Sequence, residues 1–174
     1  MTESLFTVVS AWLLAAIFAV AVRHKIFSWV RFCASLQAYE LVPESMTKLA
    51  AGLIILAELL AIAGLVPVYA FGFALASILL TVYLLAILIN MLRGRSFIDC
   101  GCGDEPTGLS NWLVLRNFLL VGVSVTGFFS VASISLGLVL IGLCLAVVAY
   151  LLYAALDQMI TNHGLHRRLW LEES

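Results

Sequence analysis

Residues 69–92 read YAFGFALASILLTVYLLAILINML and contain no Asp, Glu, Lys, Arg or His. A helix needs about 20 apolar residues to cross the hydrocarbon core of a bilayer. Within lipid, a helix also satisfies its own backbone hydrogen-bonding groups, which an open strand cannot do. The stretch therefore predicts a transmembrane helix.

Four further apolar runs flank this stretch, at residues 5–22, 49–66, 112–129 and 136–156. Pro67 separates the second run from residues 69–92, because proline lacks the N–H that a continuing helix needs. Of the 174 residues, 64% are hydrophobic and 11% are charged, whereas soluble domains have about 25% charged residues. We therefore predict a single domain, residues 1–174, that forms an all-α integral membrane bundle of about five transmembrane helices. The net charge of −1 gives no basic field for nucleic acid.

Two longer connections join these runs. Residues 24–46 mix apolar with basic and polar side chains, which predicts a short amphipathic helix at the membrane surface. Residues 93–110, here called the dithiol connection, contain four glycines and a proline, which predicts a loop. Ser110 or Asn111 can cap the helix that follows.

The basic residues are unevenly distributed along the chain. With five spans, the two longer connections and the C-terminus share one side of the membrane, and that side holds all nine Lys and Arg residues. They are Arg23, Lys25, Arg31, Lys48, Arg93, Arg95, Arg116, Arg167 and Arg168. Because cytoplasmic loops are rich in Lys and Arg, we expect a multi-pass protein of the bacterial inner membrane with a periplasmic N-terminus and a cytoplasmic C-terminus. Glu3, and the lack of a basic residue before the first run, argue against a cleaved signal peptide.

The motif Cys100-Gly101-Cys102 is the main chemical clue. Residues two positions apart lie within about 7 Å at full extension, and a disulfide needs Cα atoms about 4.4–6.8 Å apart. Such a small ring is strained, and strained disulfides exchange readily. The motif predicts a redox pair, and the alternatives are metal binding or thiols without chemistry. Two thiols supply only two of the four ligands that zinc usually takes, so no metal ion is predicted.

Two other cysteines are weaker candidates. Cys33 shares the expected membrane side with the pair and is a candidate resolving thiol, although a lone cysteine more often packs as a small apolar residue. Cys144 falls deep in the run 136–156, where a thiolate is disfavoured. We expect Cys144 to have a packing role.

Glu58 is the most unusual polar residue, because it lies near the middle of the run 49–66. A carboxyl group at that depth is costly and usually faces the interior of the bundle. One interpretation is a proton relay or a group that contacts a cofactor. The other is a hydrogen bond between helices, for example with Tyr83 or Tyr150.

Six candidate supporting residues lie in the dithiol connection or on the helix ends beside it. They are Asn90, Arg93, Arg95, Asp99, Arg116 and Asn117. Arg93 and Arg95 would favour thiolate formation at the pair, whereas Asp99 and Asp104 would oppose it. Arg116 can extend to the membrane surface or pair with Asp99. Asn90 and Asn117 can form hydrogen bonds between helices. Together, Asn90, Arg93, Arg116 and Asn117 could clamp the connection over the membrane surface, and ordinary anchoring at the interface is the alternative.

Several of these motifs, taken in order, resemble the MauE family and its wider DoxX-like relatives. The residues that carry the resemblance are Lys25, Tyr39-Glu40-Leu41-Val42-Pro43, Glu58, Arg93-Gly94-Arg95, Asp99-Cys100-Gly101-Cys102 and Arg116-Asn117. The resemblance extends from about residue 25 to residue 120. In the family, Phe-Gly is expected after the second cysteine, whereas here Gly103-Asp104 follows.

The resemblance implies a role in methylamine utilisation, as a maturation factor for the small (β) subunit of periplasmic methylamine dehydrogenase. That subunit is rich in disulfides and carries a tryptophan-derived quinone. A thioredoxin-like partner, MauD, is also implied, together with thiol–disulfide exchange at Cys100 and Cys102. No cofactor is identified in the chain, and a quinone that accepts the electrons has no supporting motif.

Two other functions fit the sequence less closely. One is a non-catalytic membrane scaffold, because so little of the chain lies outside the spans. The other is a carrier of protons or small solutes that uses Glu58. The expected cytoplasmic side of the pair also conflicts with a periplasmic client. The conflict disappears if the pair exchanges with the cytoplasm, if the connection is reached through the bundle, or if one run does not insert.

Overall fold

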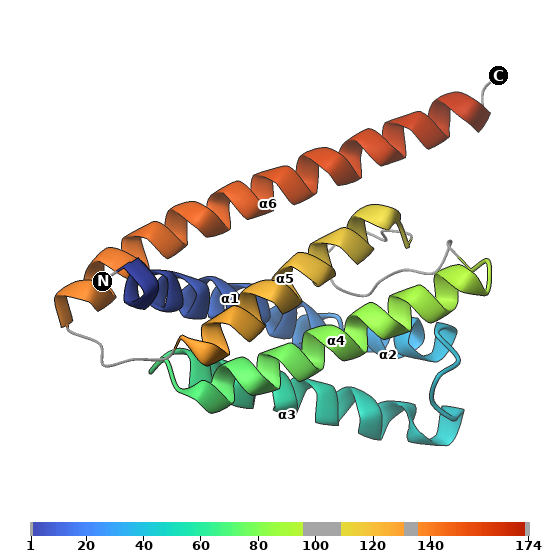
Figure 1. Cartoon of the computed structure of the whole chain (residues 1–174). Helices are drawn as coiled ribbons and strands as arrows, with labels where there is room; N and C mark the ends of the chain where they lie inside the picture. Colours follow the sequence, from blue (N-terminus) through green and yellow to red (C-terminus); the bar gives the residue numbers. More distant parts are fainter. Residues whose placement is uncertain (1, 96–108, 131–135, 173–174) are drawn as a thin grey trace.

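The computed structural model describes residues 2–95, 109–130 and 136–172, and every regular element in these ranges is helical. Five long helices and two short ones follow one another along the chain (Figure 1). They are α1 (Thr2–Phe27), α2 (Trp29–Ala38), η1 (Glu44–Met46), α3 (Thr47–Leu65), α4 (Ala70–Leu92), α5 (Asn111–Phe129) and α6 (Leu136–Glu172). The long helices α1, α3, α4, α5 and α6 are each long and apolar enough to cross a membrane, which confirms the predicted fold class.

Successive long helices run in opposite directions. Figure 1 shows the N-terminus at one end of the bundle, and the end of α4 and the C-terminus at the other. Short α2 follows α1 after a one-residue break at Ser28 and packs on α3, so the predicted helix within residues 24–46 is present. The order of the spans therefore agrees with the one expected from the sequence.

Two helices extend beyond the predicted spans. α1 continues to Phe27 instead of ending near residue 22, and α6 continues to Glu172 instead of ending near residue 156. The 37 residues of α6 measure about 55 Å at 1.5 Å each, whereas a hydrocarbon core is about 30 Å thick. The predicted spans end where the apolar runs end, but a helix can continue through the polar residues that follow.

The helices α1, α3, α4 and α5 form the four-helix core. Its buried side chains come from all four helices and include Leu14, Phe18, Leu65, Phe73, Leu80 and Leu120. α4 lies between α3 and α5, and α1 packs on α3. In α5, Ser124 donates a hydrogen bond of 2.9 Å to the carbonyl oxygen of Phe73, and Ser77 of α4 donates one of 2.9 Å to Ser124. Hydrogen bonds of this kind join helices within lipid.

Glycines allow the closest contacts in the four-helix core. A Cβ atom added to Gly72 would lie 2.4 Å from the carbonyl carbon of Gly64, so α3 and α4 touch through their backbones beside the hairpin. A Cβ atom added to Gly127 of α5 would lie 2.3 Å from the ring of Phe73. Small residues at helix interfaces let backbones approach in this way.

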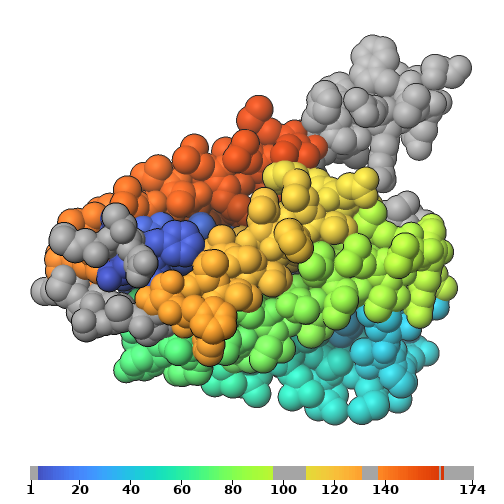
Figure 2. All heavy atoms as spheres, in the orientation of Figure 1, coloured from blue at the N-terminus to red at the C-terminus, as the bar shows by residue number. Residues whose placement is uncertain are grey.

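α6 lies outside the four-helix core and packs mainly along α1 (Figures 1 and 2). Gly142 and Ala146 are buried at this contact, where a Cβ atom added to Gly142 would lie 2.4 Å from Val8. Of the other apolar side chains of α6 that the structure describes, most are exposed, and so is Cys144. The predicted packing role of Cys144 is therefore wrong. In a run that is apolar on all sides, sequence does not indicate which face meets protein and which meets lipid.

Candidate functional site

A buried cluster of charged and aromatic side chains joins three helices of the core. Lys25 of α1 forms an ion pair with the Oε1 atom of Glu58 on α3, and the side chains are only 3% and 0% exposed. Tyr83 of α4 donates a hydrogen bond of 2.7 Å to the same oxygen. These three residues are here called the Lys25 cluster. Opposite charges so far from solvent attract strongly, because little water screens them.

Aromatic rings surround the ammonium group of Lys25. Its Nζ atom lies 5.3 Å from the centre of the Phe32 ring and 5.0 Å from the centre of the Tyr83 ring. At such distances the faces of the rings attract a cation. By contrast, the second carboxylate oxygen of Glu58, Oε2, is buried and has no hydrogen-bond partner within residues 2–95, 109–130 and 136–172.

The sequence predicted only part of this cluster. The contact of Glu58 with Tyr83 is confirmed, whereas Tyr150 stacks on Tyr153 instead, with ring centroids 6.5 Å apart. The sequence places Lys25 among the basic residues of one membrane side but does not predict its burial, and in the structure its side chain turns into the core. A signal for this pair was present in the sequence. Lys25 and Glu58 are opposite charges in apolar helices, and both are among the residues that carry the family resemblance.

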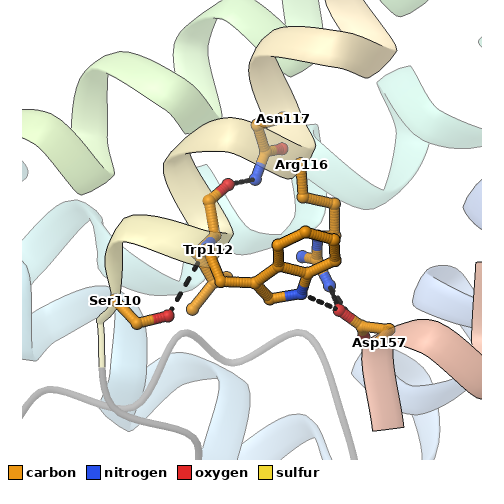
Figure 3. A network of polar contacts seen from close by, with 6 residues as sticks. Ser110, Trp112, Arg116, Asn117 and Asp157 are labelled. Carbon is orange, nitrogen blue, oxygen red and sulfur yellow. Dashed lines mark hydrogen bonds and ion pairs between the residues drawn. The ribbon is translucent and has the colours of Figure 1, made fainter. Parts of the chain in front are cut away.

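A second polar network joins α5 to α6 (Figure 3). The Arg116 guanidinium donates hydrogen bonds of 3.1 and 3.0 Å to the two carboxylate oxygens of Asp157 on α6. Trp112, one turn earlier on α5, donates a bond of 2.9 Å from its indole nitrogen to Asp157. Ser110 caps α5 as predicted, because its hydroxyl accepts a bond of 3.4 Å from the backbone N–H of Leu113. The first turns of α5 are thus fixed both by a cap and by α6.

The structure gives described partners to three of the predicted residues. Arg116 pairs with Asp157, and Asp99 lies outside the described residues. The amides of Asn90 and Asn117 were expected to join helices, but they donate to Ala86 and to Leu113, four residues earlier on their own helices. In the described part of the chain, the bonds that these two amides donate thus stay within their own helices, because a short polar side chain reaches the carbonyl of its own preceding turn most easily.

The turn after α2 contacts both described ends of the dithiol connection. Glu40, which has a positive φ of 49°, pairs with Arg95 at 2.7 Å. Tyr39 belongs to one buried cluster with Ile87, Leu109 and Leu113. Arg93 is exposed. The connection therefore leaves α4 and enters α5 beside the same turn.

The structure describes some of the cysteines and not others. Cys100 and Cys102, predicted as the redox pair, lie outside the described residues. Cys33 is a free, half-buried thiol on α2, next in sequence to Phe32 of the aromatic surroundings of Lys25. Among the described residues, no three His, Cys, Asp or Glu side chains are grouped so that they could hold a metal ion.

Comparison with known proteins agrees with these motifs. The family model described as "Methylamine utilisation protein MauE" matches residues 3–130, a range that contains the Lys25 cluster and the dithiol connection. This chain belongs to the MauE family. Proteins named methylamine utilization protein MauE are similar to it in three bacteria. The one from Methylophilus methylotrophus is 34% identical over an alignment of 163 residues that covers 87% of this chain and 86% of that protein.

The two other MauE relatives come from Paracoccus. The protein from Paracoccus denitrificans is 32% identical over 147 residues, or 80% of this chain and 79% of its own. The protein from Paracoccus versutus is 37% identical over 115 residues, or 64% of this chain and 62% of its own. No solved structure matches the chain significantly. Membership of the MauE family connects this chain with methylamine utilisation.

Proposed function

We propose that this MauE-family protein is a maturation factor of the bacterial inner membrane for the small (β) subunit of methylamine dehydrogenase. The observation that carries the proposal is a Cys-Gly-Cys motif, in a MauE-family chain, between two membrane-spanning helices. The anchoring of Arg95 by Glu40, and of Arg116 by Asp157, supports it, because both pairs hold a helix end beside that motif.

The proposed chemistry is thiol–disulfide exchange. A thiolate of the client attacks the Cys100–Cys102 disulfide and forms a mixed disulfide, and a second client thiolate then displaces the remaining Cys sulfur. The client gains a disulfide, and Cys100 and Cys102 become a dithiol that has received two electrons. The dithiol then reduces the disulfide of a thioredoxin-like partner, MauD. The Cys100–Cys102 disulfide re-forms, and MauD becomes a dithiol that carries the two electrons. Cys33 is a candidate for resolving a mixed disulfide.

The decisive experiment replaces both cysteines, as Cys100→Ser/Cys102→Ser, in a bacterium that makes methylamine dehydrogenase. We expect the β subunit to be lost or wrongly bridged, as measured by its abundance and its disulfide map. Cys144→Ser is the matched control, because Cys144 is exposed on α6. Normal, correctly bridged β subunit in the double variant would remove the dithiol from the mechanism.

The orientation is part of the same proposal. The basic end of the bundle faces the cytoplasm under the positive-inside rule, with the dithiol connection at that end. Exchange with a periplasmic client therefore requires that the connection be reached through the bundle. Reporter fusions after Leu65, after Gly108 and at the C-terminus test the orientation. We expect a periplasmic signal after Leu65 and cytoplasmic signals at the other two sites. A periplasmic signal after Gly108 would reverse the orientation.

A membrane scaffold is the second candidate, and α6 is the observation that favours it. α6 packs mainly along α1, and most of its described apolar side chains are exposed, so it offers a long surface to other membrane helices. A scaffold tolerates the double cysteine substitution. It loses function instead when bulky residues replace small ones on the exposed face of α6.

A further inference from the structure

The Lys and Arg side chains that the structure describes come from the end of the bundle that carries the dithiol connection, and two groups among them differ. Lys25, Arg95 and Arg116 each form an ion pair with a carboxylate of the chain. By contrast, three cations are exposed and form no ion pair with any residue that the structure describes. They are Arg23, Lys48 and Arg93, here called the open cations.

The open cations lie at the ends of three helices of the four-helix core. Arg23 is one turn before the end of α1, Lys48 is in the first turn of α3, and Arg93 follows the last residue of α4. Because successive long helices run in opposite directions, these positions share one end of the bundle (Figure 1). Among the described acids at that end, Glu44 is exposed and outside the ion pairs, but it is one charge against three. The described residues of this end therefore do not neutralise its positive charge.

Exposed apolar side chains lie within one helical turn of each open cation. They are Phe27 near Arg23, Leu49 beside Lys48 and Leu92 beside Arg93, with exposed fractions of 85%, 58% and 88%. At the edge of a membrane, such side chains contact acyl chains, and a long basic side chain beside them extends its charge to the headgroups. A partner that fits this combination offers both an anionic group and apolar chains.

We propose that the open cations bind the headgroup phosphates of anionic phospholipids, whose acyl chains lie against the neighbouring apolar side chains. A phosphate oxygen accepts strong, charge-assisted hydrogen bonds from guanidinium and ammonium groups. An anionic membrane surface attracts each nearby Lys or Arg by an amount equal to about fivefold in affinity. An acidic soluble protein is the alternative partner, but it would leave the apolar side chains beside the cations in water. Lipid binding of this kind depends neither on the proposed redox chemistry nor on the orientation of the chain.

Spin-labelled lipids test the proposal on the full-length protein in vesicles of phosphatidylcholine. Phosphatidylglycerol is anionic, whereas the choline group of phosphatidylcholine cancels the charge of its phosphate. The fraction of each spin-labelled lipid that the protein immobilises gives the ratio of the two affinities. We expect the wild-type protein to prefer phosphatidylglycerol by about fivefold or more. The ratio should fall when salt rises from about 0.1 M to about 1 M, because the Debye length falls from about 10 Å to about 3 Å.

Variants assign the preference to the open cations. Arg23→Gln/Lys48→Gln/Arg93→Gln removes all three charges and should bring the ratio of affinities close to one. The matched control is Glu40→Gln/Arg95→Gln, which removes a paired cation of the same end together with its acid and should keep the wild-type ratio. Arg23→Lys/Arg93→Lys keeps the charges and should also keep the ratio. If the triple variant does not fold, each single variant should lower the ratio in part.

A wild-type ratio near one would overturn the proposal. So would an undiminished ratio in the triple variant or in all three single variants, or an equal loss in the paired control. Polyglutamate, a soluble polyanion, distinguishes the alternative partner. If it binds the protein in detergent while the wild-type lipid ratio is near one, the open cations serve an acidic protein and not lipid.

Discussion

The four-helix core and α6 are held by different kinds of contact. In the core, α1, α3 and α4 meet at an ion pair without solvent and at glycines whose backbones touch. α6 lies against α1 along one side and is tied to α5 by a pair whose side chains are 15% and 29% exposed. Both regions use one acid and one base to join helices. Burial, not the number of charges, decides what such a pair contributes to stability.

The largest expected effect is at the buried pair. Glu58→Gln leaves the Lys25 ammonium without a counter-charge, and removal of one partner from a buried pair costs about 3–5 kcal/mol. Equilibrium unfolding in detergent and SDS measures the loss of stability. Lys25→Met/Glu58→Gln is the control and should be more stable than Glu58→Gln alone. A loss below about 1 kcal/mol in the single variant, the value typical of a surface pair, would erase the difference between the two regions.

The next effect separates the glycines of the two regions. Gly64→Ala places a Cβ atom within 2.7 Å of the Gly72 Cα atom, which neither backbone can avoid, so we expect a loss of about 1–3 kcal/mol. Gly142→Ala meets only the Val8 side chain closely, and α6 can move outward, so its loss should be smaller. Unfolding midpoints of the purified variants give the order.

Gly52→Ala is the control for both glycine variants, because its added Cβ atom has no neighbour within 4 Å beyond the adjoining residues and backbone of its own helix. It should be neutral or stabilise α3 by up to about 1 kcal/mol, because alanine favours helix more than glycine does. Equal losses in Gly64→Ala and Gly142→Ala would mean that α6 is held as rigidly as the core.

A smaller effect is expected at the pair between α5 and α6. Asp157→Asn removes the charge that Arg116 binds but keeps an oxygen that can accept from Trp112. Because both side chains are partly exposed, we expect a loss of about 1 kcal/mol or less. A double-mutant cycle of Asp157→Asn with Arg116→Gln gives the coupling energy. A coupling as large as that of Lys25 with Glu58 would contradict the comparison.

The smallest effect is expected at Cys144. This side chain is exposed on α6, so Cys144→Ser should change stability by no more than about 0.5 kcal/mol. The unfolding midpoint measures it, beside Ala146→Leu as a contrast, because Ala146 is only 3% exposed where α6 meets α1. If the two substitutions cost the same, the exposed and packed faces of α6 are not distinct.

Sequence predicts the elements well because each depends on neighbouring residues. The apolar run 69–92 nearly coincides with α4, Pro67 lies in the α3–α4 hairpin, and Ser110 caps α5. The candidate site is predicted less completely. Glu58 and Arg116 stand out as polar residues in or near apolar runs, but their partners Lys25 and Asp157 lie on other helices, 33 and 41 residues away. Nothing in the sequence near Glu58 or Arg116 specifies which distant residue becomes its partner.

From the sequence alone came the membrane as solvent, the five spans and the resemblance to the MauE family, because apolar length and ordered motifs are properties of the chain itself. The tertiary structure decided which residues meet. It turned Lys25 into the core, brought Asp157 to Arg116 and left Cys144 exposed. The physical reason is that lipid and protein interiors are both apolar. A uniformly apolar helix therefore does not specify its packed face, and only the arrangement of its neighbours does.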